Sequence, residues 1–140
     1  MTIFSGRKPR DLGVHDSRLG DCPSSPNCVC SDASRDSHRV EAFRLAKAPA
    51  EAWRLVRESV ERLPRTRVIS DTGTYLHAEC RSALFGFVDD LELQLRVDEG
   101  LVAVRSASRI GYSDLGVNRE RVRALRRELV RRAVVAPGSS

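Results

Sequence analysis

The stretch "RSASRIGYSDLGVNRERV", residues 105–122, concentrates arginines, serines, an aspartate and an asparagine between an expected strand and an expected helix. Two earlier stretches, "HAECR" at 77–81 and "VDDLEL" at 88–93, add carboxylates, a histidine and another arginine. Guanidinium groups bind carboxylates and phosphates through paired hydrogen bonds. The pattern therefore predicts a binding pocket for an anionic ligand, formed by Arg81, Asp89, Asp90, Arg105, Arg109, Tyr112, Asp114 and Asn118.

The same side chains have a second interpretation, in which they bind one another and brace the end of a sheet. Strand parity directs Asp89 toward the apolar face, where a carboxylate must be hydrogen-bonded. We expect Asp89 to be buried and to accept hydrogen bonds from residues 105–118, with Arg105, Arg109, Ser108 or backbone N–H groups as donors. Asp90 is expected on the opposite, solvated face beside Arg109.

Three cysteines and a histidine in the N-terminal part could in principle hold zinc: Cys22, Cys28, Cys30 and His38. The spacing C-x5-C-x-C is not that of a common zinc motif. We therefore expect no metal, and instead a proline-braced loop with small, free thiols. A disulfide between Cys22 and Cys28 remains open as an alternative.

Nucleophilic catalysis by a cysteine requires a histidine within hydrogen-bond reach of the thiol. His77 and Cys80 are three residues apart on one expected strand, so their side chains point to opposite faces. Acid–base chemistry by Asp89, Asp90 or His77 stays open, but no nucleophile, metal set or phosphate loop accompanies them. The residues predict a non-enzymatic binding module without a cofactor, with an enzyme for a small substrate as the third choice.

The elements that must position these residues follow from hydrophobic periodicity. Residues 38–46 predict a strand, 48–64 a helix and 66–70 a short strand, and a second helix begins near Asn118, a good N-cap residue. Three stretches alternate apolar and polar residues and predict strands at 74–83, 87–97 and 101–110. Glycine, proline and serine recur before residue 38 and predict an irregular arm.

The alternating strands combine into a sheet with one apolar face. A two-residue turn at Glu99-Gly100 would pair Asp98 with Leu101 and place Leu95 opposite Val104. The expected core contains Trp53, Leu91, Leu93, Leu95, Val102 and Val104. Two amphipathic helices are available to cover this face.

The element order, strand–helix–four strands–helix, predicts an α+β fold. It has an antiparallel sheet of about five strands with two helices on one face, as in TBP-like and helix-grip folds. The expected organisation is an irregular arm over residues 1–38 packed on the domain, one domain over 39–134 and a loose tail over 135–140.

Three longer motifs carry a family resemblance: "CPSSPNCVCS" at 22–31, "AECRSALFGFVDDLEL" at 78–93 and "VRSASRIGYSDLGVNRERV" at 104–122. Together they resemble the domain of unknown function 1499 family (DUF1499) over nearly the whole chain after residue 11. The resemblance implies no activity. The family pattern usually reads "SPNCVSS", and Cys30 stands here in place of serine, which argues against a family-wide metal or redox role for it.

Composition narrows the functional classes. Only Lys8 and Lys47 among the 24 basic residues are lysines, so 22 are arginines, and the net charge is +5. Acidic residues are interleaved with them and no run of five like charges occurs, so we expect a solvated surface and no nucleic-acid partner. No stretch approaches the roughly 18–20 apolar residues of a membrane span, and no signal peptide stands out, which predicts a cytoplasmic protein.

These observations favour a binding module for a small anionic or amphiphilic ligand. The alternative is a structural or protein-interaction domain whose Arg/Asp cluster only braces the fold. The oligomeric state stays open.

Overall fold

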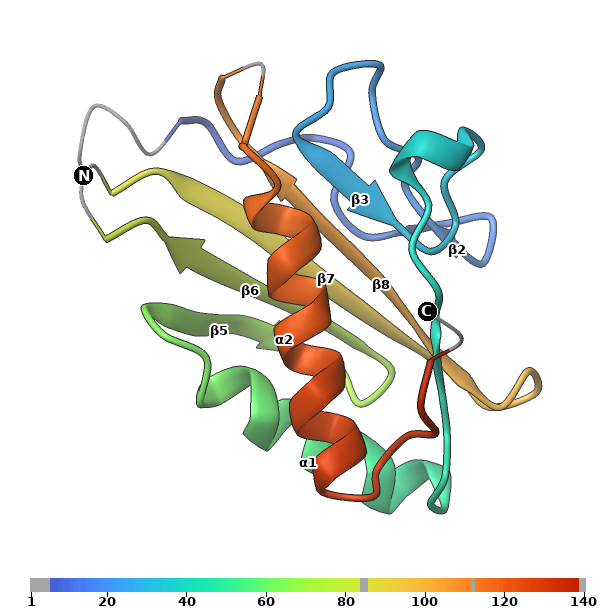
Figure 1. Ribbon diagram of the computed structural model, residues 1–140. Helices are drawn as coiled ribbons and strands as arrows, with labels where there is room; N and C mark the ends of the chain where they lie inside the picture. Colours follow the sequence, from blue (N-terminus) through green and yellow to red (C-terminus); the bar gives the residue numbers. More distant parts are fainter. Residues whose placement is uncertain (1–5, 84–85, 112, 139–140) are drawn as a thin grey trace.

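The computed structural model describes residues 6–83, 86–111 and 113–138. Its main feature is a twisted antiparallel sheet with two helices on one face (Figure 1). The strands follow in the spatial order β3 (Cys28–Cys30), β8 (Leu101–Ser108), β7 (Val88–Arg96), β6 (Tyr75–Arg81) and β5 (Thr66–Asp71), and β4 (Phe43–Arg44) pairs with β8 beside β3. The helices are α1 (Pro49–Glu61) and α2 (Val117–Arg131). The predicted α+β class is confirmed.

The strand expected at 38–46 forms only over the two residues of β4. Along the C-terminal half of β8 the neighbouring strand is instead β3, which belongs to the arm and pairs Val29 with Ser106. The arm also contains a small hairpin, β1 (Val14–His15) and β2 (Arg18–Leu19), and the 3-10 helix η1 (Asp36–His38). The arm is therefore more regular than its turn-rich composition predicts.

The core lies between the helices and the apolar face of the sheet. Leu91, Leu93, Val102 and Val104 are fully buried there, and Trp53 joins them from α1, as expected. Trp53 also donates from Nε1 to the Asp71 carboxylate at 2.9 Å, so its polar edge is satisfied at the sheet edge.

The register between β7 and β8 differs from the expected one by two residues. Leu93, not Leu95, lies opposite Val104, and Glu92 lies opposite Arg105. The connection after Arg96 is a four-residue turn, closed by the Gly100 N–H on the Val97 carbonyl, and not the two-residue turn we expected. Because the shift is an even number, every side chain keeps its predicted face.

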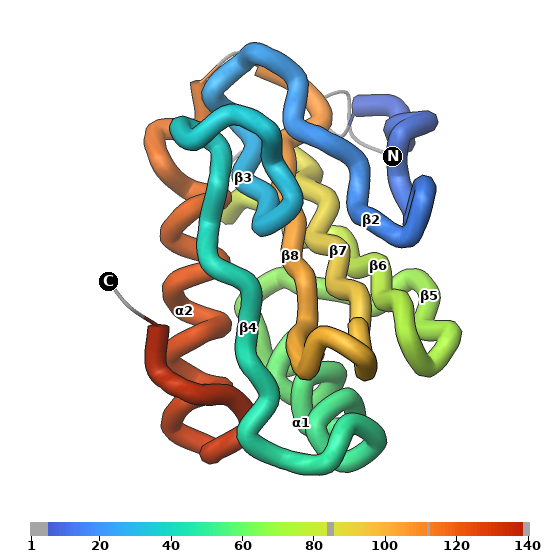
Figure 2. The backbone as a smooth tube through the Cα atoms, turned by 90° about the vertical axis from the view of Figure 1, so that its right-hand side faces the viewer, coloured from blue at the N-terminus to red at the C-terminus, as the bar shows by residue number. Residues whose placement is uncertain are grey.

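The arm covers the second face of the sheet. Figure 2 shows α2 on one side of the strands and the chain around β2 on the other. Leu19, Cys22 and Ala33 of the arm pack with Ala103 and Ala107 of β8. The face we expected to be solvated is therefore an interior layer of the protein.

The chain after α2 returns to the sheet edge, where Val135 is buried and bridges Leu45, and the Ala136 N–H donates to the Arg44 carbonyl. The first residues of the expected loose tail are thus bound. Neither of the described helices has the length and apolar content needed to cross a bilayer.

Candidate functional site

The polar residues of the second sheet face form a buried ionic network with the arm. Glu92 is completely buried and accepts hydrogen bonds from the Tyr75 hydroxyl and the Gly13 N–H, each at 2.7 Å. Arg105 donates to Glu92 at 3.3 Å and to the arm residue Asp11 at 3.1 Å. Burial, and next the Glu92 charge, raise the pKa of Tyr75, so its phenol stays a hydrogen-bond donor. This part of the cluster attaches the arm to the sheet.

A second buried group surrounds Asp90, which is 1% exposed. Arg109 donates to both carboxylate oxygens at 2.8 Å, and the His77 ring nitrogen Nε2 lies 2.6 Å from Oδ1. Glu79 takes another hydrogen bond from Arg109 at 2.7 Å. Burial acts to raise the pKa of Asp90, but the hydrogen bonds from Arg109 and His77 outweigh it and lower the pKa.

These contacts correct two expectations. Asp90 and Arg109 are neighbours on one face, as predicted, but that face is buried and not solvated. Arg105 and Arg109, which we expected to bind an anionic ligand, are bound by the protein's own carboxylates. Their charge is already compensated, so the structure favours bracing over anion binding for this half of the predicted site.

Asp89 points to the opposite face and is buried, as strand parity predicts. Its partner is Arg121 of α2, with 2.8 Å between Nη2 and Oδ2. The side chains of Arg105 and Arg109 lie on the opposite face of the sheet and do not bind it. Ser108 lies directly opposite Asp89 in the register but binds the amide of Asn118. Among the described residues Arg121 is the one partner of the Asp89 carboxylate, and it contacts only Oδ2.

The N-cap residue of α2 is Gly116 and not Asn118, and the Asp114 side chain caps the first turn. The Asp114 carboxylate accepts the N–H groups of Gly116 at 2.8 Å and Asn118 at 3.1 Å. Gly116 has φ of 81°, a left-handed conformation that suits glycine at the start of the helix. Burial alone would raise the pKa of Asp114, but hydrogen bonds from Asn118 outweigh it and lower the pKa, so the group is ionised at neutral pH.

Asn118 itself lies inside the first turn, where it is fully buried. Its side chain accepts from Ser106 at 2.7 Å and donates to Ser108 at 2.9 Å. Arg121 also donates to its Oδ1 at 2.8 Å. Asn118 thus joins the helix start to β8 and to Arg121, the partner of Asp89.

A pocket of about 180 Å³ opens beside Asp89 at the end of the sheet. We call it the sheet-end pocket; its walls include Phe87, Val88, Asp89, Ile110, Asp114 and Val117. Phe87, Ile110 and Val117 are at least one-third exposed at its rim. The pocket combines apolar walls with a buried carboxylate, which suits a ligand with an apolar body and a hydrogen-bond donor.

Two further members of the predicted site stand apart. Arg81 is exposed at the end of β6 and donates to the Gly86 carbonyl at 3.5 Å. Tyr112 lies outside the described residues. The eight predicted residues therefore do not form one pocket.

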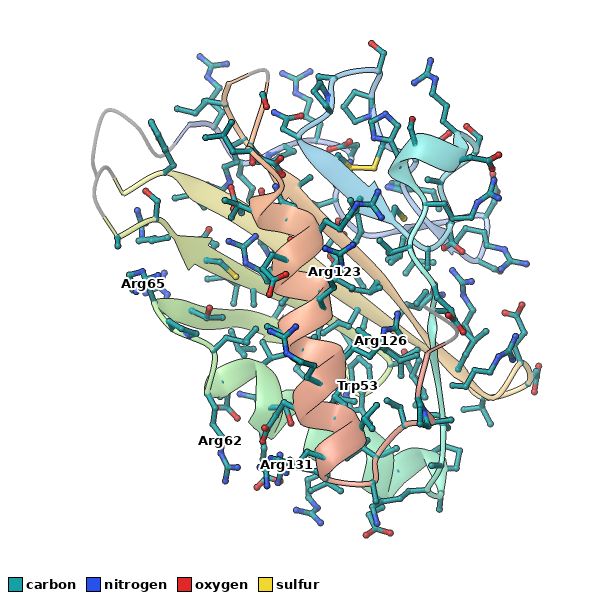
Figure 3. All side chains as sticks on the ribbon, viewed as in Figure 1. Trp53, Arg62, Arg65, Arg123, Arg126 and Arg131 are labelled. Carbon is teal, nitrogen blue, oxygen red and sulfur yellow. A yellow bond between two sulfur atoms is a disulfide. The ribbon has the colours of Figure 1, made fainter. Side chains whose placement is uncertain are left out.

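The cysteine loop contains a disulfide between Cys22 and Cys28, which corrects our expectation of free thiols (Figure 3). Their sulfurs are unavailable to a metal while the bond persists, and His38 makes a hydrogen bond to the Cys28 carbonyl. The described residues contain no cluster of three or more metal-binding side chains. Cys30 is free and buried, and burial raises the pKa of its thiol to about 11.

Sequence reasoning missed the residue that pairs with Asp89 and the residues that cover the second face. Arg121 precedes Leu125 by four residues and so flanks the buried side of the helix, a signal present in the periodicity. Asp11 and Asp32 gave no such signal, because their partners Arg105 and Arg96 lie 94 and 64 residues away in the chain.

The geometry can now be compared with known proteins. A family model described as "Protein of unknown function (DUF1499)" matches residues 18–129. The chain belongs to this family. The DUF1499 match includes the disulfide, all strands of the main sheet and most of α2, whereas Asp11 and Gly13 precede it. No curated protein and no solved structure matches the chain.

Proposed function

We propose that this domain is a non-enzymatic binding module for a small amphiphilic ligand, which it holds in the sheet-end pocket. The observation that supports this most is the Asp89 carboxylate, which is buried beside apolar walls and, among the described residues, is paired with Arg121 alone. A buried carboxylate gains from every donor that reaches it. A ligand hydroxyl or amine would supply such a donor.

The pocket selects the ligand by charge and size. Asp89 and Asp114 both line it, so an anionic head group would meet two carboxylates. This narrows our expectation of an anionic or amphiphilic ligand to a neutral or cationic amphiphile for this site. A cavity of about 150 Å³ holds a ligand of benzene size, so a volume of about 180 Å³ takes a short chain or one ring.

The alternative is that the polar residues only brace the fold. It draws its support from the network under the arm, where Glu92, Asp90, Arg105 and Arg109 bind one another. The two readings concern opposite faces of the sheet and are compatible. Catalysis by Asp90 or His77 is the least supported reading, because both are buried under the arm and bind each other.

The compartment is part of the proposal. The sequence predicts the cytoplasm, but the Cys22–Cys28 disulfide favours an oxidising compartment, since cytosolic thiols are kept reduced. Thiol counting on protein from its native cells would separate the two.

Ligand-observed NMR with 1-hexanol and hexanoate as probes tests the binding proposal. Val117 lies at the pocket rim on the first turn of α2 and is 50% exposed, so Val117→Glu adds charge where a helix tolerates it. Val97 is 56% exposed at the far end of the sheet, and Val97→Glu is the matched control. We expect the wild type to bind hexanol in preference to hexanoate. Hexanol binding should be lost in Val117→Glu and kept in Val97→Glu. Equal binding by both variants, or a preference for hexanoate, would refute the proposed site.

A further inference from the structure

A second concave surface lies on the outer side of α2, away from the sheet-end pocket. It is a groove of about 380 Å³ between α2 and the extended residues 39–41. We call it the arginine groove. Its lining residues are Arg39, Val40, Glu41, Arg119, Val122, Arg123, Arg126 and Arg127. Five arginines and one glutamate thus line the groove.

Arg39 pairs with Asp36 at 2.9 Å and Arg127 with Glu120 at 3.0 Å, whereas main-chain carbonyls position Arg119 and Arg126. Arg119 donates to the carbonyls of Ser37 at 2.9 Å and Arg39 at 3.4 Å. Arg126 donates to the carbonyls of Glu41 and Ala42 and lies 4.7 Å from the centre of the Phe43 ring. A carbonyl orients a guanidinium without cancelling its charge, so these groups remain available to an anion.

Arg123 completes the row. It is exposed and makes no hydrogen bond or ion pair with the described residues. Arg119, Arg123 and Arg126 follow one another at helical spacings of four and three, so they line one side of α2 over roughly 10 Å. Figure 3 shows Arg123 and Arg126 along α2, with Arg131 at the far end of the helix.

The half-buried position of Arg126 also favours anion binding. Burial lowers the pKa of Arg126, with a smaller opposing effect of the Glu41 charge. The guanidinium remains charged near neutral pH, since arginine is effectively always protonated. A half-buried cation that is only partly compensated gains when an anion approaches it.

We propose that the arginine groove binds the phosphate groups of a small soluble molecule, in particular one that carries two adjacent phosphates. Arginine forks match phosphate oxygens in pairs, and successive arginines along the helix can contact successive phosphates. Val40 and Val122 provide an apolar floor for the rest of the molecule. The half-buried position of Arg126, between α2 and residues 41–43, suits a small ligand better than a flat membrane or a DNA duplex.

Pyrophosphate is the probe, and its binding is measured by calorimetry at low and moderate salt. Arg123→Gln removes a cation that stabilises nothing in the described structure, so the melting temperature should not change. Arg131→Gln removes the same charge from the last turn of α2, where the side chain binds Glu128, and is the matched control. We expect Arg123→Gln to weaken pyrophosphate about five- to tenfold, in line with the loss of one charge-assisted contact. Arg131→Gln should leave the affinity within about twofold.

Three results with the wild type and the single variants would overturn the proposal. They are an absence of saturable pyrophosphate binding, an equal loss in both variants, and saturable binding only to a DNA duplex or to phosphatidylglycerol vesicles. The double variant Arg119→Gln/Arg123→Gln should abolish binding, and retained affinity would contradict the row of contacts. Hexanol binding is measured on the same variants. It should be unchanged, which keeps this test separate from that of the sheet-end pocket.

Discussion

Asp89 and Asp90 are adjacent in the chain but lie on opposite faces of the sheet, and the structure predicts that Asp90→Ala is the more damaging change. Asp90 is 1% exposed and binds Arg109 twice and His77 once. Its removal leaves a buried guanidinium and a buried imidazole without this partner, for which a loss of about 3–5 kcal/mol in unfolding free energy is typical. Arg109 keeps its hydrogen bond to Glu79 at 2.7 Å, so we expect Asp90→Ala to lower the unfolding free energy by about 3–4 kcal/mol.

Asp89→Ala should cost only about 1–2 kcal/mol, because a single ion pair is lost. Arg121 keeps two hydrogen bonds after this change, to Ser106 at 3.0 Å and Asn118 at 2.8 Å. Asp98→Ala, at the exposed turn between β7 and β8, is the control and should change stability by less than about 0.5 kcal/mol.

Urea unfolding followed by fluorescence of the single Trp53 measures all three variants without screening the ion pairs. The order of destabilisation should be Asp90, then Asp89, then Asp98. An Asp90→Ala variant that is as stable as the control would show that the arm does not bury this face. An Asp89→Ala variant that is the least stable would show that the faces are assigned the wrong way round.

The pH dependence gives an independent check on Asp90. Its folded-state pKa is lowered, so its contribution to stability is present above the unfolded pKa and disappears as the pH falls through the folded pKa. The difference in unfolding free energy between the wild type and Asp90→Asn should therefore be constant near neutrality and shrink below about pH 4. A difference that grows on acidification would contradict the ion pair.

Three further predictions concern the core and the cysteines. Leu93→Ala should lower the unfolding free energy by roughly 2–5 kcal/mol in urea melts, because Leu93 is fully buried, and an unchanged curve would contradict the core. Cys22→Ala/Cys28→Ala should lower the unfolding free energy in urea melts by roughly 2 kcal/mol, because the disulfide restricts the unfolded chain over a separation of six residues. An unchanged unfolding free energy would show that the disulfide does not form. Cys30 should resist iodoacetamide at pH 8 in the folded protein and react after unfolding, since its pKa is about 11; prompt alkylation of the native protein would show it to be accessible.

Strand faces were predictable from the sequence because they depend only on parity. Leu93 and Asp90 fall on the expected faces although the register is shifted by two residues. The number of residues in the turn before Leu101 was not predictable, since Gly100 suits a two-residue turn and a four-residue turn equally. The cross-strand pair Glu92–Arg105 depends on that number and was therefore missed.

The role of the arm could not be derived from local patterns. Its contacts with the sheet are ionic pairs and hydrogen bonds between residues far apart in the chain, such as Asp11 with Arg105 and Gly13 with Glu92. An isolated aspartate in a glycine-rich segment looks the same whether it is solvated or buried against an arginine. The polar face consequently appeared solvated, and Arg105 and Arg109 were expected in the same pocket as Asp89, although they lie on the opposite face of the sheet.

A titration of ¹⁵N-labelled protein with 1-hexanol, followed by two-dimensional NMR, tests the central claim most directly, because it locates the ligand residue by residue. The sheet-end pocket predicts saturable shifts at Val88, Asp89, Ser108, Gly111 and Val117. The amides of Val97–Gly100, at the opposite end of the sheet, should not move. Saturable shifts elsewhere, or none at any residue, would contradict a ligand site beside Asp89.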